Sequence, residues 1–252
     1  MTHVWDLDHD LVGRAGVSER VADKHRAYVF WSGGLDSTTL IYLLLTRGYK
    51  VCAGRVLLDN NGAQLAAESV AIEHLTALLN RDFPERFTCE EAMKVEVKSC
   101  CDEMILSQPV LWVTAAAMVA KDCEVVAFGY VMHDCAISFL PEIVAAYEAL
   151  TSFRCGIIPR IVFPFRKNMK EELIHLLPEE YQARIVWCER PTKRGKVCGS
   201  CKSCQTMKGA CPALYYKRAP HAKKPDPKDL SKPTSKKPIY VPRLREKRKK
   251  HK

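Results

Sequence analysis

The stretch Ala27-Tyr28-Val29-Phe30-Trp31 and the residues behind it, Ser32-Gly33-Gly34-Leu35-Asp36-Ser37, decide the fold of this chain. Five apolar residues in a row predict a buried strand, and the polar stretch with its two glycines predicts a turn. The following residues, Thr38–Thr46, predict a helix that is closed by Gly48. A strand, a short loop and a helix in this order are typical of a parallel sheet built from βαβ units.

The same alternation of strands and helices continues along the chain. Further strands are predicted at Lys50–Leu58, Glu124–Phe128, Arg160–Phe165 and Ala183–Trp187. Further helices are predicted at Leu65–Leu79, Val110–Lys121, Leu140–Leu150 and Asn168–Leu177. Strands separated by helices of this length predict an α/β fold with a doubly wound parallel sheet.

Changes in composition divide the chain into four segments. Residues 1–26 show no clear period and are predicted to form an N-terminal arm, and residues 27–187 form the α/β domain. Residues 188–216 are rich in cysteine, and residues 217–252 form a basic tail in which prolines are spread among lysines. Because such a tail cannot build a core, it is predicted to be extended or disordered.

The positive charge of the chain is concentrated in the tail. The chain has 39 Lys and Arg against 29 Asp and Glu, a net charge of +10. From Lys217 to Lys252 there are 15 basic and 3 acidic residues, so the remainder carries 24 minus 26, or −2. The tail therefore predicts non-specific contact with nucleic acid through phosphate neutralisation, or else a terminus that only adds solubility.

Cysteine content and hydropathy bear on the cellular compartment. The chain has 12 cysteines, and Met1–Asp10 is polar and acidic, unlike a signal peptide. The apolar stretches of about ten residues are too short to span a bilayer. These features predict a cytoplasmic protein without membrane association, in which the thiols stay reduced or bind a metal.

The loop Ser32–Ser37 lies where a ligand is expected. In an open parallel sheet, ligands bind beyond the carboxyl ends of the strands, where loops lead into helices. Gly33 and Gly34 allow the backbone to approach a ligand closely, while Ser37 and Thr38 can cap the helix or bind anionic oxygens. The lysine of the Walker loop is missing, so this is a different kind of phosphate loop. The alternative is a glycine turn before a capped helix, without a ligand.

Four cysteines have the spacing of a metal site. Cys188, Cys198, Cys201 and Cys204 form the pattern C-x9-C-x2-C-x2-C, and four thiolates suit tetrahedral Zn²⁺. A metal would also order a segment that has few apolar residues of its own. An iron–sulfur cluster is an alternative because Cys211-Pro212 follows the triplet, and unligated or redox-active thiols are another. Cys211 is the reserve candidate for the fourth ligand.

The two motifs together resemble a known family. The loop matches S-G-G-x-D-S, the PP-loop of the ATP pyrophosphatase superfamily, at each fixed position. With the four cysteines near the C-terminus, residues 28–211 resemble the 7-cyano-7-deazaguanine synthase family (QueC). The resemblance implies a Rossmann-like sheet of the adenine nucleotide alpha hydrolase type and an AMP-forming ligase. That ligase would use ATP with Mg²⁺, hold one Zn²⁺, and convert 7-carboxy-7-deazaguanine and ammonia to the nitrile.

The resemblance also implies roles for individual residues. The catalytic candidates are Ser32, Asp36 and Ser37. The nucleotide-binding candidates are Ser32, Gly33, Gly34, Leu35, Asp36, Ser37, Thr38, Asp59 and Lys170. His133, Asp134 and Cys135 follow the strand that begins at Glu124, so they are candidates for contact with the substrate.

Three segments depart from the family at the substrate end. The family's F-D-Y-G-Q corresponds to Leu58–Gly62, its V-P-G-R-N to Ser107–Leu111, and its D-Y-S-G-Y-P-D-C-R-P-E to Asp134–Glu142. The activation chemistry therefore carries over more safely than the substrate does.

These departures leave several functions open. The chain can be a divergent deazaguanine synthase of a phage DNA-modification pathway or a component of an anti-phage defence system with another substrate. It can also be a tRNA-modifying enzyme with Cys135 as sulfur carrier, or a non-catalytic nucleotide-binding partner of another protein. A homodimer is one possible state of the chain.

Overall fold

A five-stranded parallel sheet forms the centre of the molecule. The computed structural model describes residues 25–58, 62–95, 108–120, 122–156, 158–192 and 196–219. The strands are β1 (Arg26–Phe30), β2 (Lys50–Leu58), β3 (Phe87–Val95), β4 (Val125–Ala127) and β5 (Arg160–Val162). Their order in the sheet is β3-β2-β1-β4-β5, and all neighbours are parallel. The predicted parallel sheet is thereby confirmed, with β1 at its centre.

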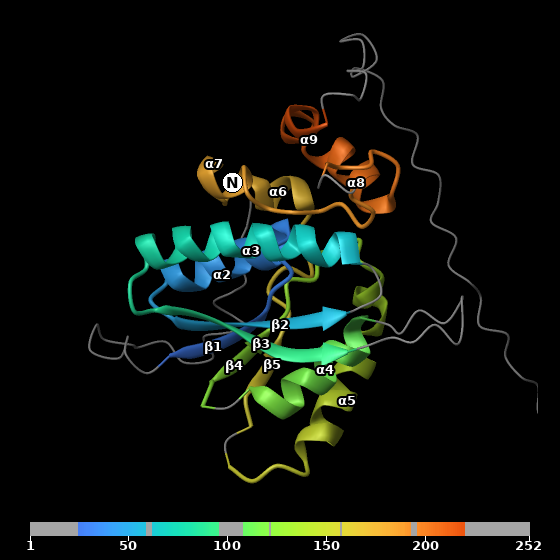
Figure 1. Cartoon of the computed structure of the whole chain (residues 1–252). Coiled ribbons are helices and arrows are strands. Elements are labelled where there is room, and N and C mark those ends of the chain that lie inside the picture. The colour runs from blue at the N-terminus through green and yellow to red at the C-terminus, as the bar shows by residue number, and fades with distance from the viewer. Residues whose placement is uncertain are drawn as a thin grey trace, which may run out of the picture. The chain divides into compact units, whose positions relative to one another are not determined.

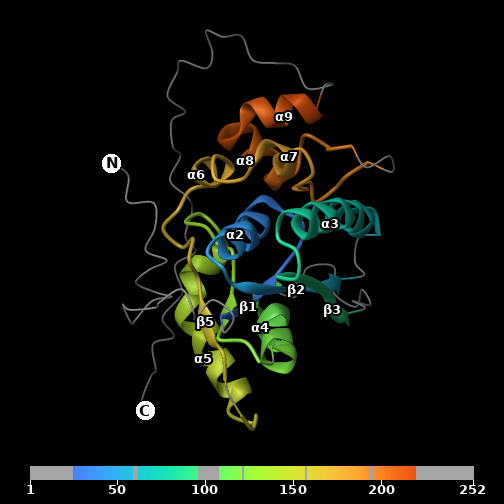
Figure 2. The same ribbon diagram turned by 90° about the vertical axis from the view of Figure 1, so that its left-hand side faces the viewer.

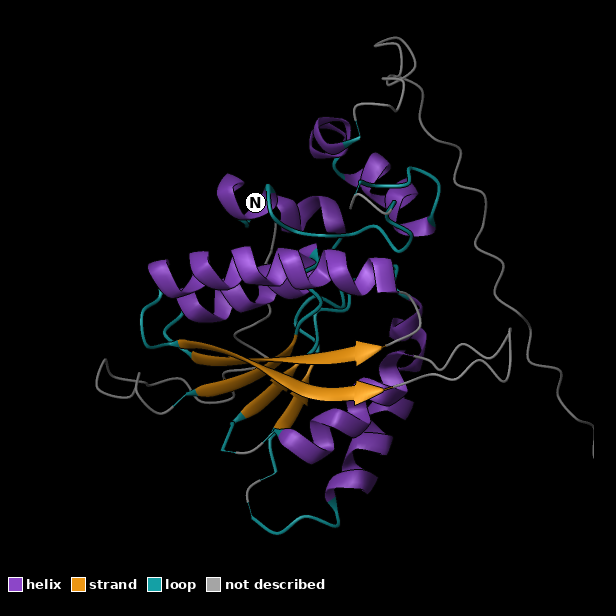
Figure 3. Ribbon diagram, viewed as in Figure 1, coloured by secondary structure: helices purple, strands orange, loops and turns teal. Residues whose placement is uncertain are grey.

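Helices cover both faces of the sheet, as Figures 1 and 3 show. One face carries α2 (Leu35–Thr46) and α3 (Gly62–Asp82), and the other carries α4 (Gln108–Val119) and α5 (Leu140–Thr151). The chain runs from β1 to β2 and β3 on one side of β1, and then returns to β4 on the other side. This is the doubly wound arrangement that the alternation of elements predicts.

The last third of the described chain forms an additional layer. It contains α6 (Lys170–Ile174), α7 (Glu179–Gln182), α8 (Lys202–Ala210) and α9 (Pro212–Arg218). Figures 1 and 2 show these helices outside the layer of α2 and α3, and α6 packs against α2. As a result α2 is covered from both sides, and its residues Leu40, Ile41, Leu44 and Leu45 are fully buried.

The core explains why β1 is the central strand. Four of its five residues are buried, and Ala27 pairs with Val51 of β2 on one side and with Val125 of β4 on the other. Across the face covered by α4 and α5, the ring of Phe30 stacks on Phe128 at a centroid distance of 5.2 Å. Apolar residues without alternation are typical of a parallel strand buried on both faces.

Several predicted elements differ from the structure. Ala183–Trp187 is not a strand: α7 ends at Gln182 and the residues behind it are irregular. β3 escaped prediction because charged residues interrupt its apolar ones, and its side chains are largely exposed. The segment predicted as a cysteine-rich loop contains α8 and α9. In the described part of the chain, no helix is long and apolar enough to cross a membrane.

Candidate active site and metal centre

The phosphate loop, Ser32–Ser37, lies at the point where the winding of the sheet reverses. β1 leads through this loop into α2 on one face, whereas the chain beyond β4 leads into α5 on the other face. Because β1 and β4 are neighbours in the sheet, their connections diverge to opposite faces, and ligands of open parallel sheets bind at such a switch point. The sequence predicted that the loop follows the carboxyl end of a strand. The strand order shows in addition that this strand, β1, borders the switch point.

The loop leads into α2, and no side chain caps the N-terminus of this helix. α2 begins at Leu35, three residues before the predicted start, and its N-cap Gly34 makes no side-chain cap. The first amide with a helical partner is that of Thr38, which donates to Gly34 O at 3.1 Å. The earlier amides of the first turn therefore have no intrahelical acceptor and can bind an anion. The prediction that Ser37 or Thr38 caps this helix is wrong.

The side chain of Thr38 is used by the core. It is fully buried, and its hydroxyl accepts a hydrogen bond from Trp31 Nε1 at 3.0 Å. This contact ties the first turn of α2 to the end of β1. A structural role therefore accounts for the Thr38 hydroxyl.

Two glycines allow the close approaches that shape the site. Gly33 has φ +72°, a conformation that is strained for other residues. Gly129, just beyond β4, lies so close to the loop that a Cβ atom there would stand 3.0 Å from the backbone of both Asp36 and Ser37. Only glycine fits at this position without displacing the loop, so the ends of β1 and β4 meet directly.

An ion pair joins the loop to α6. Lys170 Nζ lies 2.6 Å from Asp36 Oδ2, and the two side chains are 25% and 19% exposed. Burial raises the pKa of Asp36, although Lys170 acts in the opposite direction. Burial alone would lower the pKa of Lys170, but Asp36 and Asp134 outweigh it and the net direction is upward. Lys170 is therefore a cation that its ion pair with Asp36 holds at the loop, and the negative charge of Asp134 favours it further.

Two buried oxygen atoms of the loop have no partner. Among the described residues, Asp36 Oδ1 and Ser37 Oγ are buried and make no hydrogen bond. A buried polar atom without a partner costs free energy, and such atoms often mark a ligand site. A carboxylate oxygen and a hydroxyl next to a helix N-terminus fit a phosphate with its hard divalent cation. The residues present are thus compatible with Mg²⁺ and a phosphorylated ligand.

The segment beyond β4 brings one of the three substrate candidates to the loop. Asp134 accepts a hydrogen bond from the backbone of Val131 at 3.0 Å, and its charge acts on both Asp36 and Lys170. Cys135 is exposed and begins a short 3-10 helix, η2 (Cys135–Phe139), and His133 is exposed as well. The structure therefore associates Asp134 with the ion pair and leaves the other two at the surface. Asp59, the remaining nucleotide candidate, lies outside the described residues.

Tyr130 is a further candidate for contact with a ligand, and sequence analysis did not identify it. Its ring packs between Trp112 and Phe163 at centroid distances of 6.2 and 6.1 Å, yet its buried hydroxyl has no partner among the described residues. Burial raises the pKa of Tyr130, and Asp134 and Cys135 raise it further, so the hydroxyl stays protonated and can donate. Nothing in the sequence singled out Tyr130, because the sequence does not distinguish a paired hydroxyl from an unpaired one.

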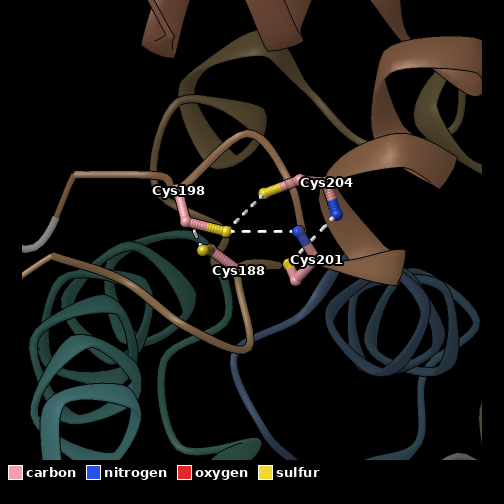
Figure 4. Close-up of side chains that lie close together, drawn as sticks. All are labelled: Cys188, Cys198, Cys201 and Cys204. Atoms are coloured by element: carbon pink, nitrogen blue, oxygen red, sulfur yellow. Dashed lines mark hydrogen bonds between the residues drawn. The ribbon is translucent and has the colours of Figure 1, made fainter.

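The four candidate metal ligands come together in one cluster, shown in Figure 4. The Sγ atoms of Cys188, Cys198, Cys201 and Cys204 all lie within 4.8 Å of one another. The Sγ atoms of Cys198 and Cys204 are 3.9 Å apart, against about 3.8 Å for two thiolates bound tetrahedrally at the usual Zn–S length. This cysteine cluster is therefore compatible with a single Zn²⁺ ion. A four-iron cluster would hold its cysteines further apart, because each sulfur binds a different iron.

Backbone donors prepare the cluster for a cation. Burial opposes ionisation of Cys198, but the amides of Ser200 and Cys201, at 3.4 and 3.3 Å from its sulfur, prevail and lower the pKa of this thiol to about 6. Burial raises the pKa of Cys188 and of Cys204. Cys198 is thus a thiolate at neutral pH, and the metal itself would deprotonate Cys188 and Cys204.

Cys211 lies apart from the cluster. It is buried where α8 meets α9, and its charge interactions are with Glu171, Asp36 and Lys170. Burial raises the pKa of this thiol to about 11. The preference for Cys188 over Cys211 as the fourth member of the cluster agrees with the structure, although Cys188 does not end a strand as the sequence suggested.

Comparisons with known proteins give little further information. Neither a family profile nor a characterised protein sequence matches the chain. Among solved structures, the chain is similar to a protein of Methanocaldococcus jannaschii described as a predicted subunit of tRNA methyltransferase. The sequence identity is 17% and the TM-score is 0.39, over 60% of this chain and 74% of that one. A similarity of this size is too low to bear on function.

Proposed function

We propose that this chain is an AMP-forming ligase of the PP-loop type, which activates a carboxylate or amide oxygen by adenylation. The observation that carries the proposal is the pair of unpartnered oxygens, Asp36 Oδ1 and Ser37 Oγ, in a loop that opens α2 at the switch point. The S-G-G-x-D-S pattern alone is compatible with an empty turn. Buried oxygens that lack partners next to free helix amides favour a phosphate ligand.

The residues of the site suit cleavage between the α- and β-phosphates. The amides of the first turn of α2 and the hydroxyl of Ser37 would bind the pyrophosphate that leaves, while a substrate oxygen attacks the α-phosphorus. Mg²⁺ bound with ATP would offset the charge of the phosphates. Lys170 neutralises Asp36 at the edge of this site, which reduces the repulsion between this carboxylate and the departing group. Asp134 and Tyr130 line the adjoining β4 side, where the substrate would enter.

The substrate is a separate question from the chemistry. The PP-loop and the cysteine cluster favour 7-carboxy-7-deazaguanine with ammonia, as in the 7-cyano-7-deazaguanine synthase family, with Zn²⁺ in the cluster. The altered segments beyond β2 and β4 favour a different acid. We therefore extend the proposal only to the class of reaction and name the deazaguanine as the first acid to test.

A nucleic acid that carries the reacting group is the second candidate substrate. Residues 183–219 contain nine Lys or Arg and one acidic residue, Glu189. Lys202 and Lys208 on α8 and Lys217 on α9 are exposed. Exposed lysines on the two helices that follow the cysteine cluster suit a phosphate backbone, and binding to it would weaken steeply with salt.

Labelled ATP tests the proposal directly. The purified protein is incubated with Mg²⁺ and ATP labelled at the α- or the γ-phosphate, together with 7-carboxy-7-deazaguanine and ammonia or with tRNA. The expected products are labelled AMP from ATP that carries the label at the α-phosphate, and labelled pyrophosphate from ATP that carries it at the γ-phosphate. ADP and orthophosphate, formed without pyrophosphatase present, would overturn the proposal. AMP formed only with tRNA would keep the chemistry and replace the substrate.

A further inference from the structure

The segment Ile185–Trp187, here called the strap, connects the phosphate loop to the cysteine cluster. The amide of Val186 donates a hydrogen bond to Gly33 O at 2.9 Å. A Cβ atom on Gly33 would lie 3.6 Å from the Val186 side chain, and one on Gly34 would lie 3.5 Å from Val186 O. The strap therefore runs along the two glycines of the loop. Cys188, the first member of the cluster, follows it immediately.

Arg218, at the end of α9, holds the strap on both sides of Val186. Its guanidinium donates a hydrogen bond to Ile185 O and stacks over the ring of Trp187 at 4.5 Å from the centroid. A planar guanidinium can make both contacts at once, whereas an ammonium group can make only one well. The residue that meets the loop is thus fixed between the two residues that Arg218 contacts.

The position of Arg218 depends in turn on the cysteine cluster. α9 is joined to α8 at Cys211, and α8 carries Cys204 among its few buried residues. Tyr215, one turn before the end of α9, is buried, and α9 packs against α8, which carries Cys204. With a metal bound, the four cysteines would fix α8, and α8 would fix α9. The loop, the strap, Arg218 and the cluster form one chain of contacts.

We propose that Arg218 is a positioning residue for the phosphate loop, holding Val186 against Gly33 from a helix that the metal-bound cysteine cluster keeps in place. The consequence for nucleotide affinity rests on the proposed function, but the contact between strap and loop does not. Because coupling between two sites is reciprocal, metal and nucleotide should each strengthen the binding of the other. Effects of this kind change affinity by about fivefold or more.

Hydrogen–deuterium exchange of the zinc-loaded full chain tests the proposal without a ligand in the loop. Arg218→Ala should speed exchange about fivefold or more in the peptides that contain Val186 and the phosphate loop, and leave β4 and β5 unchanged. Lys217→Ala removes the same charge from the neighbouring, exposed position of α9 and should change neither peptide. Arg218→Lys keeps the positive charge but loses the planar group that stacks on Trp187. Its exchange rates in these peptides should lie between those of the wild type and those of Arg218→Ala.

Chelation of the zinc distinguishes positioning from simple loss of stability. In the wild type, chelation should speed exchange in the same two peptides, and in Arg218→Ala it should add little, because both changes break one chain of contacts. Equal effects of chelation in both proteins, or an unchanged loop in Arg218→Ala, would overturn the proposal. Binding of a non-hydrolysable ATP analogue is measured in parallel. If the wild type does not bind the analogue while exchange behaves as expected, the proposed function fails and the positioning role stands.

Discussion

The phosphate loop and the cysteine cluster are both short polar segments with ligand-binding groups, but different forces hold them. The loop lies between β1, with four buried residues out of five, and α2, with eight buried residues. The cluster leads into α8, whose buried residues are Cys204 and Met207 alone. A loop held by a hydrophobic core keeps its shape without a ligand, whereas a segment with so little core relies on a bound ion for its order.

This difference sets what each site can be used for. A site prepared in advance can bind and release a nucleotide in each catalytic cycle, because its shape is already present before binding. A site that folds around its ion loses its structure when the ion leaves, so it suits a permanent metal. The loop is therefore suited to turnover and the cluster to stability.

Removing one cysteine of the cluster should have the largest effect. Cys201→Ser is expected to reduce the zinc content from about one ion per chain to almost none, because three thiolates rarely retain a structural ion. The β1–α2 unit should stay folded, since its stability comes from the sheet. Elemental analysis and circular dichroism measure the two outcomes. Cys155→Ser, which changes an exposed thiol outside the cluster, is the control. Full zinc occupancy in Cys201→Ser would contradict the assignment.

Substitution in the loop should affect catalysis while the metal is retained. Asp36→Asn is expected to lower kcat for AMP formation by about 10²–10³-fold, in the range found when one group that stabilises the transition state is removed. Nucleotide affinity should fall by less, because the effect is on charge that develops in the reaction. Glu148→Gln, which neutralises an exposed acid on α5, provides the comparison. A loss of zinc in Asp36→Asn would contradict the prediction that the metal is retained.

Substitution of Gly129, which lies close to the phosphate loop, should have a smaller effect. This effect should be confined to the loop and should not reach the cysteine cluster. Gly129→Ala would force a Cβ atom against the backbone of Asp36 and Ser37, at a cost of about 1–3 kcal/mol for a crowded site. Thermal unfolding and nucleotide titration measure this cost. Gly209→Ala is a matched control on α8, where a Cβ atom meets nothing within 4 Å and the better helix propensity of alanine should slightly raise stability. An equal loss of stability in both variants would contradict this prediction.

The pH dependence should be the weakest of these effects. Because burial raises the pKa of Asp36, the folded state binds a proton more tightly than the unfolded state, whose aspartate titrates near 3.8. Between that value and the raised pKa, the free energy of unfolding should fall as the pH rises. Mg²⁺ must displace the same proton, so its affinity with nucleotide should rise with pH, by less than about tenfold per unit. Calorimetric titration of the wild type should show this slope, and Asp36→Asn should give a flat profile.

The sequence predicted the two regions with different success, for physical reasons. The phosphate loop was identified because its glycines and serines follow a strand whose burial is evident from its composition. The four cysteines were grouped correctly from spacing alone. The strap was predicted to be a strand, because Ile185-Val186-Trp187 has the composition of one, yet it runs along the loop and is not in the sheet. Local composition measures burial and does not specify what a segment is buried against.

The contacts between distant segments could not be obtained from the sequence. The expectation that Lys170 binds nucleotide came from a resemblance, and nothing in the residues themselves indicated its ion pair with Asp36. Likewise nothing in the residues around Gly129 indicated its close approach to the loop. Arg218 and Tyr130 escaped notice entirely, since their neighbours come from other elements.

The ion pair between Asp36 and Lys170 has a consequence for biosynthesis. The two residues are 134 positions apart in the chain. At a synthesis rate of about 5–20 residues per second, Lys170 leaves the ribosome roughly 7 to 27 seconds after Asp36. During this interval β1 and α2 are already available, but the carboxylate of Asp36 has no lysine beside it. A nascent chain therefore carries this loop without the counterion of Asp36 until Lys170 has been translated.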